Sequence, residues 1–254
     1  MPKYACNMLM TDLKRAFLSW QFVLAVALSV LITFLGRSPK LYADVVSFSD
    51  NSEGFLDLTP VIAAIPYTAA FADDVTNKVQ NIYLVRCGVR LYTLSKAIAI
   101  VLSSFICVFL GKMLSALISS IWLPWAIDSS VQAYASRYMG YLLTQGHPVL
   151  FLMCARLCES MVCTLEAMAA AYISLYTLSK WITWSSPIVF HYVLTYGLWY
   201  LGVPSSVSIT RIIQGRLYFG PLWDNVILFG IIGGSTIILM VLYVQRARKW
   251  LHNA

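Results

Sequence analysis

Long apolar stretches alternate with short polar ones along the chain, and the apolar stretches match the thickness of a lipid bilayer. A spanning helix uses about 20 apolar residues, because it rises about 1.5 Å per residue across a hydrocarbon core of about 30 Å. The pattern predicts six spans, at approximately residues 16–36, 58–72, 96–121, 155–178, 181–201 and 225–244. We therefore expect an all-α polytopic membrane protein, with residues 1–254 forming one transmembrane domain.

Helix-breaking residues interrupt this pattern in two places. Pro60 and Pro66 lie inside the second apolar stretch, so we expect this short span to be kinked. Residues 202–224 contain two Pro and further Gly between the last two spans, which predicts re-entrant outer helices rather than one continuous helix. The polar segment 37–57 is expected to be a loop.

Composition and charge support a membrane location and assign an orientation. The chain is 59% hydrophobic and 11% charged with a mean hydropathy of +0.73, whereas a soluble domain carries about 25% charged residues. The net charge of +7 would raise the question of nucleic acid in a soluble protein. Here most Lys and Arg fall on the side of both termini and of segment 73–96, which the positive-inside rule places in the cytoplasm. We expect a multi-pass protein of the cell membrane, and no nucleic-acid partner.

The fourth span contains the charged residues that call for an explanation inside a bilayer. Arg156 and Glu159 are three residues apart and are expected to pair as a solvated pair near the outer interface. Glu166 lies nearer mid-membrane and shares a helix face with Glu159, so both carboxylates could line a substrate route. The alternative for Glu166 is a structural bond to a neighbouring helix. Lys112 in the third span is expected to reach the far interface.

The sequence contains no catalytic or metal-binding signature. It has no phosphate-binding loop, no H-E-x-x-H and no G-x-S-x-G, so we expect no enzyme activity in this chain. The three cysteines of the fourth span lack further ligands nearby, and His191 is expected to hydrogen-bond another helix. Gly230 and Gly234 form a G-x-x-x-G pattern that favours close helix packing.

Segment 73–96, between the second and third spans, is the most charged stretch of the chain. Apolar and basic residues recur there at three- and four-residue spacings, which predicts a short amphipathic helix over residues 74–90. Such a helix can lie on membrane lipids or enter a groove on a soluble partner. Asp73 and Asp74 at its start favour the partner over a purely anionic lipid surface. The candidate contact residues are Asp73, Asp74, Lys78, Arg86 and Arg90.

With these features the chain resembles the six-span permease subunits of bacterial ABC transporters of the second exporter type. Residues 12–17, Asp-Leu-Lys-Arg-Ala-Phe, lead directly into the first span and are similar to the family's interfacial elbow helix. Residues 64–96 are similar to its second span, cytoplasmic coupling helix and third-span start, where an Arg, a Tyr and a Ser-Lys recur. The broken segment 202–224 is similar to its re-entrant outer helices. The acidic fourth span has no place in the family pattern.

The resemblance implies an ATP-driven exporter. The chain would pair with a second permease copy or paralogue and with two cytoplasmic ATPase subunits, which carry the ATP and Mg, so that no cofactor is expected in the chain itself. Two alternatives stay open from the residues. One is a non-transporting sensor or assembly protein that holds a cytoplasmic partner through segment 73–96. The other is an ion-coupled secondary transporter that uses Glu166.

Overall fold

The computed structural model describes residues 2–35, 42–50, 58–197, 200–202 and 224–253, and every element within these ranges is helical. The elements are α1 (Pro2–Phe17), α2 (Trp20–Leu35), α3 (Val45–Asp50), α4 (Thr59–Ala64), α5 (Ala70–Thr76), α6 (Gln80–Ser119), α7 (Asp128–Tyr134), α8 (Tyr141–Thr144), α9 (Pro148–Thr177), α10 (Lys180–Tyr192), the π-helical η3 (Val193–Gly197) and η5 (Val226–Gly233), and α14 (Gly234–Asn253). The all-α prediction is confirmed for these residues. The predicted re-entrant outer helices lie almost entirely outside them.

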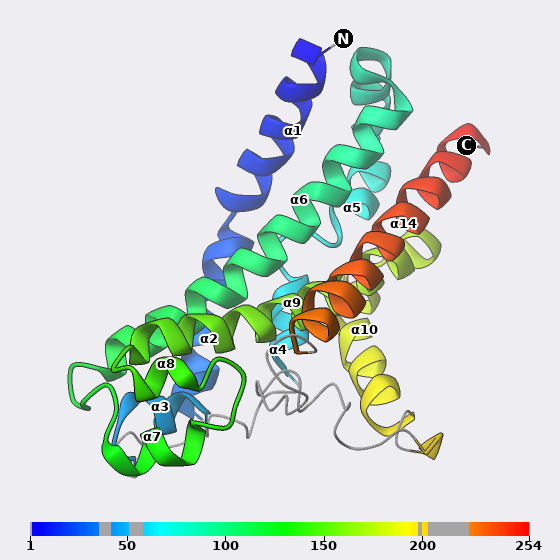
Figure 1. Cartoon of the computed structure of the whole chain (residues 1–254). Helices are drawn as coiled ribbons and strands as arrows, with labels where there is room; N and C mark the ends of the chain where they lie inside the picture. Colours follow the sequence, from blue (N-terminus) through cyan, green and yellow to red (C-terminus); the bar gives the residue numbers. More distant parts are fainter. Residues whose placement is uncertain (1, 36–41, 51–57, 198–199, 203–223, 254) are drawn as a thin grey trace.

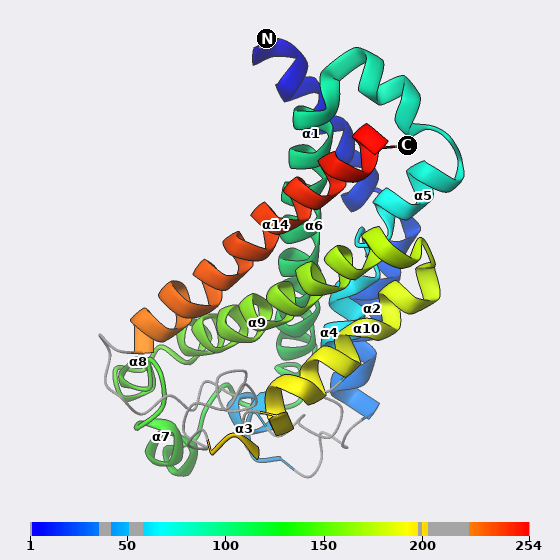
Figure 2. The ribbon, with the colours of Figure 1, turned by 90° about the vertical axis from the view of Figure 1, so that its right-hand side faces the viewer.

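The long helices run between two ends of an elongated bundle. The N-terminus, the C-terminus, α5 and the start of α6 lie at one end, as both views show (Figures 1 and 2). Helices α3, α7 and α8 gather at the opposite end. We call the first the terminal end and the second the α7 end. The polypeptide thus passes between the two ends several times.

Three helices are long and apolar enough to cross a membrane. They are α6, α9 and the continuous pair η5–α14, whose most apolar parts have mean hydropathies of 2.3, 1.6 and 2.4. Residues 8–17 of α1 together with α2 form a fourth candidate that bends by 47°. The other two predicted spans, over residues 58–72 and 181–201, are represented by shorter helices. The apolar pattern therefore located the long helices, and the count of six crossings stays a prediction.

The second predicted span is broken, as its prolines indicate. Helix α4 begins at Thr59 with Pro60 in its first turn and ends at Ala64. A turn over residues 65–69, which contains Pro66, separates it from α5. Proline lacks an N–H and clashes with the preceding turn, so it ends a helix here. The loop expected over residues 37–57 contains a further helix, α3, whose start is held by the carboxylate of Asp44 through the backbone N–H of Ser47 at 2.7 Å.

The amphipathic helix expected over residues 74–90 is shorter than predicted. Helix α5 ends at Thr76, and Lys78 adopts a left-handed backbone with φ 56°. The next helical segment begins at Gln80 and is interrupted at Gly88, where φ is 74° and ψ is 158°. A glycine tolerates this conformation because it has no Cβ. Residues 80–87 are therefore a short helix set between two backbone bends, and the remainder of α6 continues from residue 89.

The close helix contact at a glycine occurs at Gly111, and not at the G-x-x-x-G pattern that the sequence indicates. A Cβ placed on Gly111 of α6 would come within 2.4 Å of the Ser29 Cβ on α2, so the absence of a side chain allows these two helices to meet. By contrast, a Cβ on Gly234 meets nothing within 4 Å, and one on Gly230 meets only Val226 of the same helix, at 3.8 Å. Within the described residues, the G-x-x-x-G pattern brings no second helix close.

Candidate functional site

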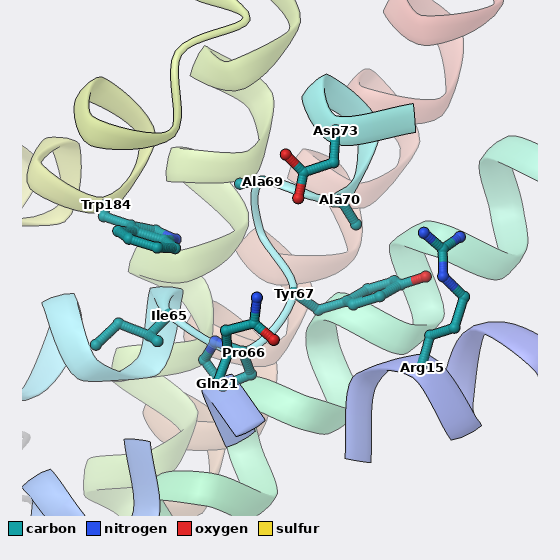
Figure 3. A pocket seen from close by; sticks show the side chains of 9 residues that line it. All are labelled: Arg15, Gln21, Ile65, Pro66, Tyr67, Ala69, Ala70, Asp73 and Trp184. Atoms are coloured by element: carbon teal, nitrogen blue, oxygen red, sulfur yellow. The ribbon is translucent and has the colours of Figure 1, made fainter. Parts of the chain in front are cut away.

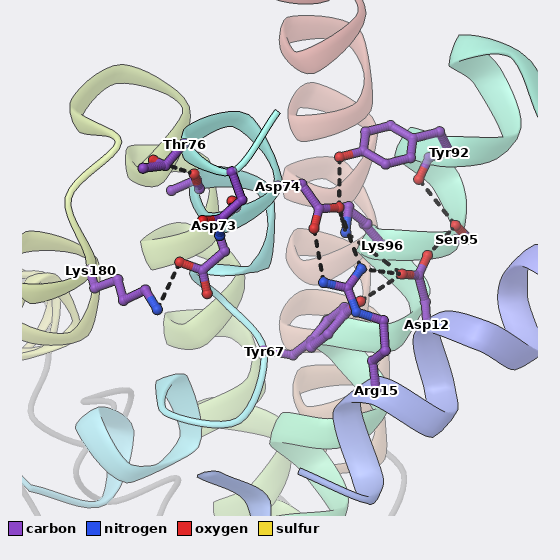
Figure 4. A network of polar contacts seen from close by, with 12 residues as sticks. Asp12, Arg15, Tyr67, Asp73, Asp74, Thr76, Tyr92, Ser95, Lys96 and Lys180 are labelled. Carbon is purple, nitrogen blue, oxygen red and sulfur yellow. Dashed lines mark hydrogen bonds and ion pairs between the residues drawn. The ribbon is translucent and has the colours of Figure 1, made fainter. Parts of the chain in front are cut away.

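A buried ion network joins α1, α5 and α6 at the terminal end (Figure 4). Asp74 of α5 lies at its centre, 2.7 Å from Nζ of Lys96 and 2.8 Å from Nη2 of Arg15. Asp12, one turn before Arg15 on α1, lies 3.6 Å from Nζ of Lys96. Asp12, Asp74 and Lys96 are at most 1% exposed, whereas Arg15 is about one-third exposed. Two carboxylates and two cations are thus brought together with balanced charge.

Hydroxyl groups add further hydrogen bonds to the two carboxylates. Tyr67, in the turn between α4 and α5, donates to Asp12 Oδ1 at 2.6 Å, and Ser95 donates to Asp12 Oδ2 at 2.5 Å. Tyr92 donates to Asp74 Oδ2 at 3.0 Å. The ammonium of Lys96 also lies 5.0 Å from the centre of the Tyr92 ring, within cation–π range. Buried ions are tolerated only when they are paired and hydrogen-bonded, and the two buried carboxylates meet both conditions.

The electrostatic surroundings of Asp74 determine whether its carboxyl group is ionised in the folded protein. Burial by itself would raise the pKa of this carboxyl, but the adjacent ammonium of Lys96 and the guanidinium of Arg15 more than compensate, so the pKa lies below its ordinary value of 3.8. Asp74 is therefore ionised at neutral pH. The network joins three helices through charge as well as packing.

The five residues expected to contact a partner fall into different environments. Asp74 is buried in the ion network, so its side chain does not reach the surface. Asp73 lies near the surface and pairs with Lys180, at the start of α10, at 2.8 Å. Lys78, Arg86 and Arg90 are exposed. The structure thus gathers three cations around the short helix 80–87 and sets the two aspartates at its base.

The short helix also exposes apolar side chains. Ile82 is 55% exposed and Val85 is 89% exposed. On its other side, Tyr83, Leu84 and Cys87 pack against the core cluster formed around Phe71 and Tyr92. One face of the segment is therefore anchored to the bundle, and the other presents apolar and basic side chains outward.

The expectation of a solvated Arg156–Glu159 pair is wrong. The two residues do pair, with 2.6 Å between Nη1 and Oε2, but Glu159 is fully buried and Arg156 is 8% exposed. Lys112 of α6 completes the group at 3.0 Å from Glu159 Oε1, so it does not reach toward the far interface. Arg156 also donates to the backbone carbonyl of Ser49 at 3.0 Å. Sequence spacing indicated the i,i+3 pair, but burial depends on α3 and α6 packing over it.

Glu166 and His191 form a third buried pair. His191 Nδ1 on α10 lies 2.8 Å from Glu166 Oε1 on α9, and both side chains are at most 2% exposed. The structural alternative for Glu166, a bond to a neighbouring helix, and the helix-bonding role of His191 are both confirmed. Glu159 and Glu166 each meet a partner on another helix. Their role in lining a substrate route stays a prediction.

Metal binding finds no support within the described part of the chain. No group of three or more His, Cys, Asp and Glu side chains lies close enough there to hold an ion. The described cysteines, including Cys154, Cys158 and Cys163, are free thiols.

Apart from Asp74, the members of the ion network were not singled out by sequence reasoning as site residues. Asp12 and Lys96 were noted only within motifs of the family resemblance, and Tyr67 and Tyr92 likewise. One available signal was the presence of charge directly beside apolar runs. Lys96 begins the apolar stretch of α6, and Asp12 and Arg15 precede that of α2. Their pairing across 84 residues could not be read from spacing.

Comparison of the chain with models of known protein families, with curated proteins and with solved structures finds no match in any of the three.

Proposed function

We propose that the chain is the transmembrane permease subunit of an ATP-driven ABC exporter, coupled to separate ATP-binding subunits through segment 73–96. The observation that carries the proposal is the short helix 80–87, which is bounded by two backbone bends and presents an outward face of apolar and basic side chains. A helix of this kind between two membrane helices suits a groove on a soluble partner.

The buried ion network supports a coupling role because it lies at the base of this short helix. Arg15 of α1 pairs with Asp74 of α5, and Asp74 pairs with Lys96 of α6. These ion pairs connect the helical segments on both sides of residues 77–91 to α1. A push on residues 80–87 would therefore be passed to α1, α5 and α6 together rather than absorbed by a loose loop. Ion-pair networks and rigid helices of this kind can carry coupling between distant sites when they have two arrangements.

The proposed setting is the cell membrane, with six crossings and both termini in the cytoplasm. Three helices, or four with the bent pair, are long and apolar enough to span. The positive-inside rule assigns the terminal end to the cytoplasm, because 11 of the chain's 18 Lys and Arg residues are Lys78, Lys180 and the cations of α1, the start of α6 and the C-terminal part of α14. A second permease copy or paralogue would complete the transport path. ATP and Mg would bind to the partner subunits.

Co-purification tests this proposal. The tagged chain, solubilised from its native membranes in mild detergent, should bring down an ATP-binding protein in near-equal amount. Reversing both exposed cations, Arg86→Glu with Arg90→Glu, should reduce that amount at least tenfold. The matched control reverses two exposed cations at the same end, Lys14→Glu with Lys249→Glu, and should retain the partner. Isolation without an ATP-binding protein would contradict the assignment.

The secondary-transporter alternative is kept because of one specific observation, the buried Glu166–His191 pair. A carboxylate beside an imidazole inside a bundle can carry a proton. In that case Glu166→Gln would abolish transport driven by a pH gradient. An ATP-driven exporter would keep most of its ATP-dependent transport in the same variant.

The sensor or assembly alternative shares the docking segment and differs in its partner. A sensor would retain, through Arg86 and Arg90, a cytoplasmic protein that does not bind ATP. The same co-purification therefore separates the two, because the retained protein either binds ATP or does not.

A further inference from the structure

A small polar cavity lies beside the break between α4 and α5. It has a volume of about 200 Å³ and is bounded by α1 and α2, the turn over residues 65–69, α5 and α10. Figure 3 shows Asp73, Gln21, Trp184 and Arg15 around it, with the ring of Tyr67 along one wall. Broken helices are the usual places where polar ligands meet membrane bundles, because backbone and side-chain polar groups become available there.

Two side chains at this cavity have hydrogen-bonding capacity that the described residues do not use. The indole N–H of Trp184 is buried and has no hydrogen-bond partner among them. Buried donors normally have partners, and an unpaired one costs about 1–3 kcal/mol. Arg15 is the second source of donors, because its guanidinium has five N–H groups and its bonds to Asp74 occupy only part of them.

The cavity offers an acceptor at a different position. Lys180 pairs with Oδ1 of Asp73 at 2.8 Å, and no described residue bonds the other carboxylate oxygen of Asp73. Asp73 comes from α5, whereas Arg15 comes from α1 and Trp184 from α10. A ligand with an acceptor group at one point and a donor group at another would satisfy both sets.

The charge balance around the cavity and its volume restrict the chemical class of the ligand. Asp12 and Asp74 balance Arg15 and Lys96, and Asp73 balances Lys180, so the surroundings favour neither an anion nor a cation. A zwitterion fits this balance. Pockets for drug-sized molecules measure about 300–1,000 Å³, so a cavity of about 200 Å³ suits a compact headgroup instead.

The surroundings indicate that such a ligand comes from the membrane. Trp181 is 79% exposed and lies against Trp184, with 5.8 Å between ring centres. Trp20, next to the cavity residue Gln21, is 67% exposed. Exposed tryptophans collect at the depth of lipid headgroups, where an apolar ring and a polar N–H are both satisfied.

We propose that this cavity binds the headgroup of a zwitterionic phospholipid with a primary ammonium, of the phosphatidylethanolamine class. A phosphodiester oxygen accepts a hydrogen bond from Trp184, and the ammonium donates to the unpaired oxygen of Asp73. The acyl chains lie along the outer surface of the bundle. This assignment does not depend on an ATP-binding partner.

Native mass spectrometry of the full chain in detergent tests the proposal, with phosphatidylethanolamine, phosphatidylcholine and phosphatidylglycerol added separately at equal concentrations. The wild type should retain one phosphatidylethanolamine, at least tenfold more tightly than the other two. Trp184→Phe keeps the aromatic ring and removes the N–H, and should weaken that binding about tenfold, the effect of one hydrogen bond to a charged group. Trp181→Phe changes the exposed neighbour and should leave it unchanged.

Two further arms identify the ammonium contact and the source of the headgroup. Asp73→Asn should remove the preference for phosphatidylethanolamine over phosphatidylcholine, since a quaternary ammonium has no N–H to donate. Soluble glycerophosphoethanolamine should bind at least a hundredfold more weakly than the lipid. Equal retention of all three lipids, or equal effects of Trp184→Phe and Trp181→Phe, would overturn the site. Equal binding of the soluble headgroup would overturn its assignment to lipid.

Discussion

Buried charge is the main residue-scale feature of this molecule, because three separate groups of ionised or ionisable side chains lie inside the helical bundle. Each group joins different helices: α1, α5 and α6; α6 and α9; and α9 and α10. Replacing such a pair by apolar residues is often tolerated, whereas removing one member leaves the other buried without compensation. Single substitutions are therefore the informative ones.

Asp74→Asn should destabilise the bundle strongly. It removes the carboxylate shared by Lys96 and Arg15, and leaves fully buried Lys96 with only Asp12 at 3.6 Å. Loss of a buried partner costs about 3–5 kcal/mol. Asp73→Asn is the matched control, because its pair with Lys180 is partly exposed and contributes at most about 1 kcal/mol. Denaturant unfolding of the two variants in detergent, followed by circular dichroism, compares their free energies of unfolding. Similar losses of stability in both variants would contradict the network.

The same network predicts how stability depends on pH. The pKa of Asp74 is lower in the folded protein than its ordinary value of 3.8, so its ionisation stabilises the fold above that value. This contribution is lost as the pH falls through the lower, folded-state pKa. Melting temperature measured from pH 7 to pH 3 should therefore fall below about pH 4. Asp74→Asn should show a smaller fall over the same range, and an identical fall would exclude Asp74 as its source.

Glu159→Gln provides an independent test at the second group. The change leaves Lys112 and Arg156 as two buried cations, 3.0 Å and 2.6 Å from a neutral amide. The protein should lose about 3–5 kcal/mol of stability. The double change Glu159→Gln with Lys112→Met removes one of the uncompensated cations and should recover part of the loss. A double variant less stable than Glu159→Gln would show that Lys112 is not held by this carboxylate.

At the scale of elements, the apolar pattern predicted the positions of the long helices because a spanning helix needs an uninterrupted apolar run. Breaks at proline were also readable, as the α4–α5 turn shows. The sequence pattern could not predict which polar residues pair with each other inside the bundle. Arg156 and Glu159 were recognised as a pair by spacing, yet their burial required Lys112 and the α3 backbone from other parts of the chain. The burial of such a pair depends on packing between segments that are distant in sequence, and the local periodicity of the sequence contains no information about that packing.

The close approach of α2 and α6 gives an element-scale prediction. Gly111→Ala places a Cβ 2.4 Å from the Cβ and 2.5 Å from the Oγ of Ser29, so the helices must separate. Overpacking of this kind costs about 1–3 kcal/mol. Gly234→Ala is the matched control, because nothing lies within 4 Å of its new Cβ. Thermal unfolding of the two variants in the same detergent should separate them, and equal midpoints would refute the contact.

At the scale of the whole molecule, the terminal end brings together the two chain ends, the ion network, the polar cavity and the short helix 80–87. The sequence indicated a charged segment between two spans, and the resemblance assigned it a coupling role. The structure replaces the single helix expected over residues 74–90 with a shorter one between two bends, and turns Asp74 inward. The proposed contact surface is accordingly smaller: Lys78, Ile82, Val85, Arg86 and Arg90.

Site-specific photo-crosslinking in native membranes tests the permease account most directly. A benzophenone side chain placed at Val85, which is 89% exposed at the terminal end, should crosslink to an ATP-binding protein that is also labelled by an azido-ATP probe. The same side chain at Trp122, which is 64% exposed and follows the distal end of α6, should give no such product. Absence of an ATP-binding protein from the Val85 product, or its equal capture from Trp122, would contradict the account.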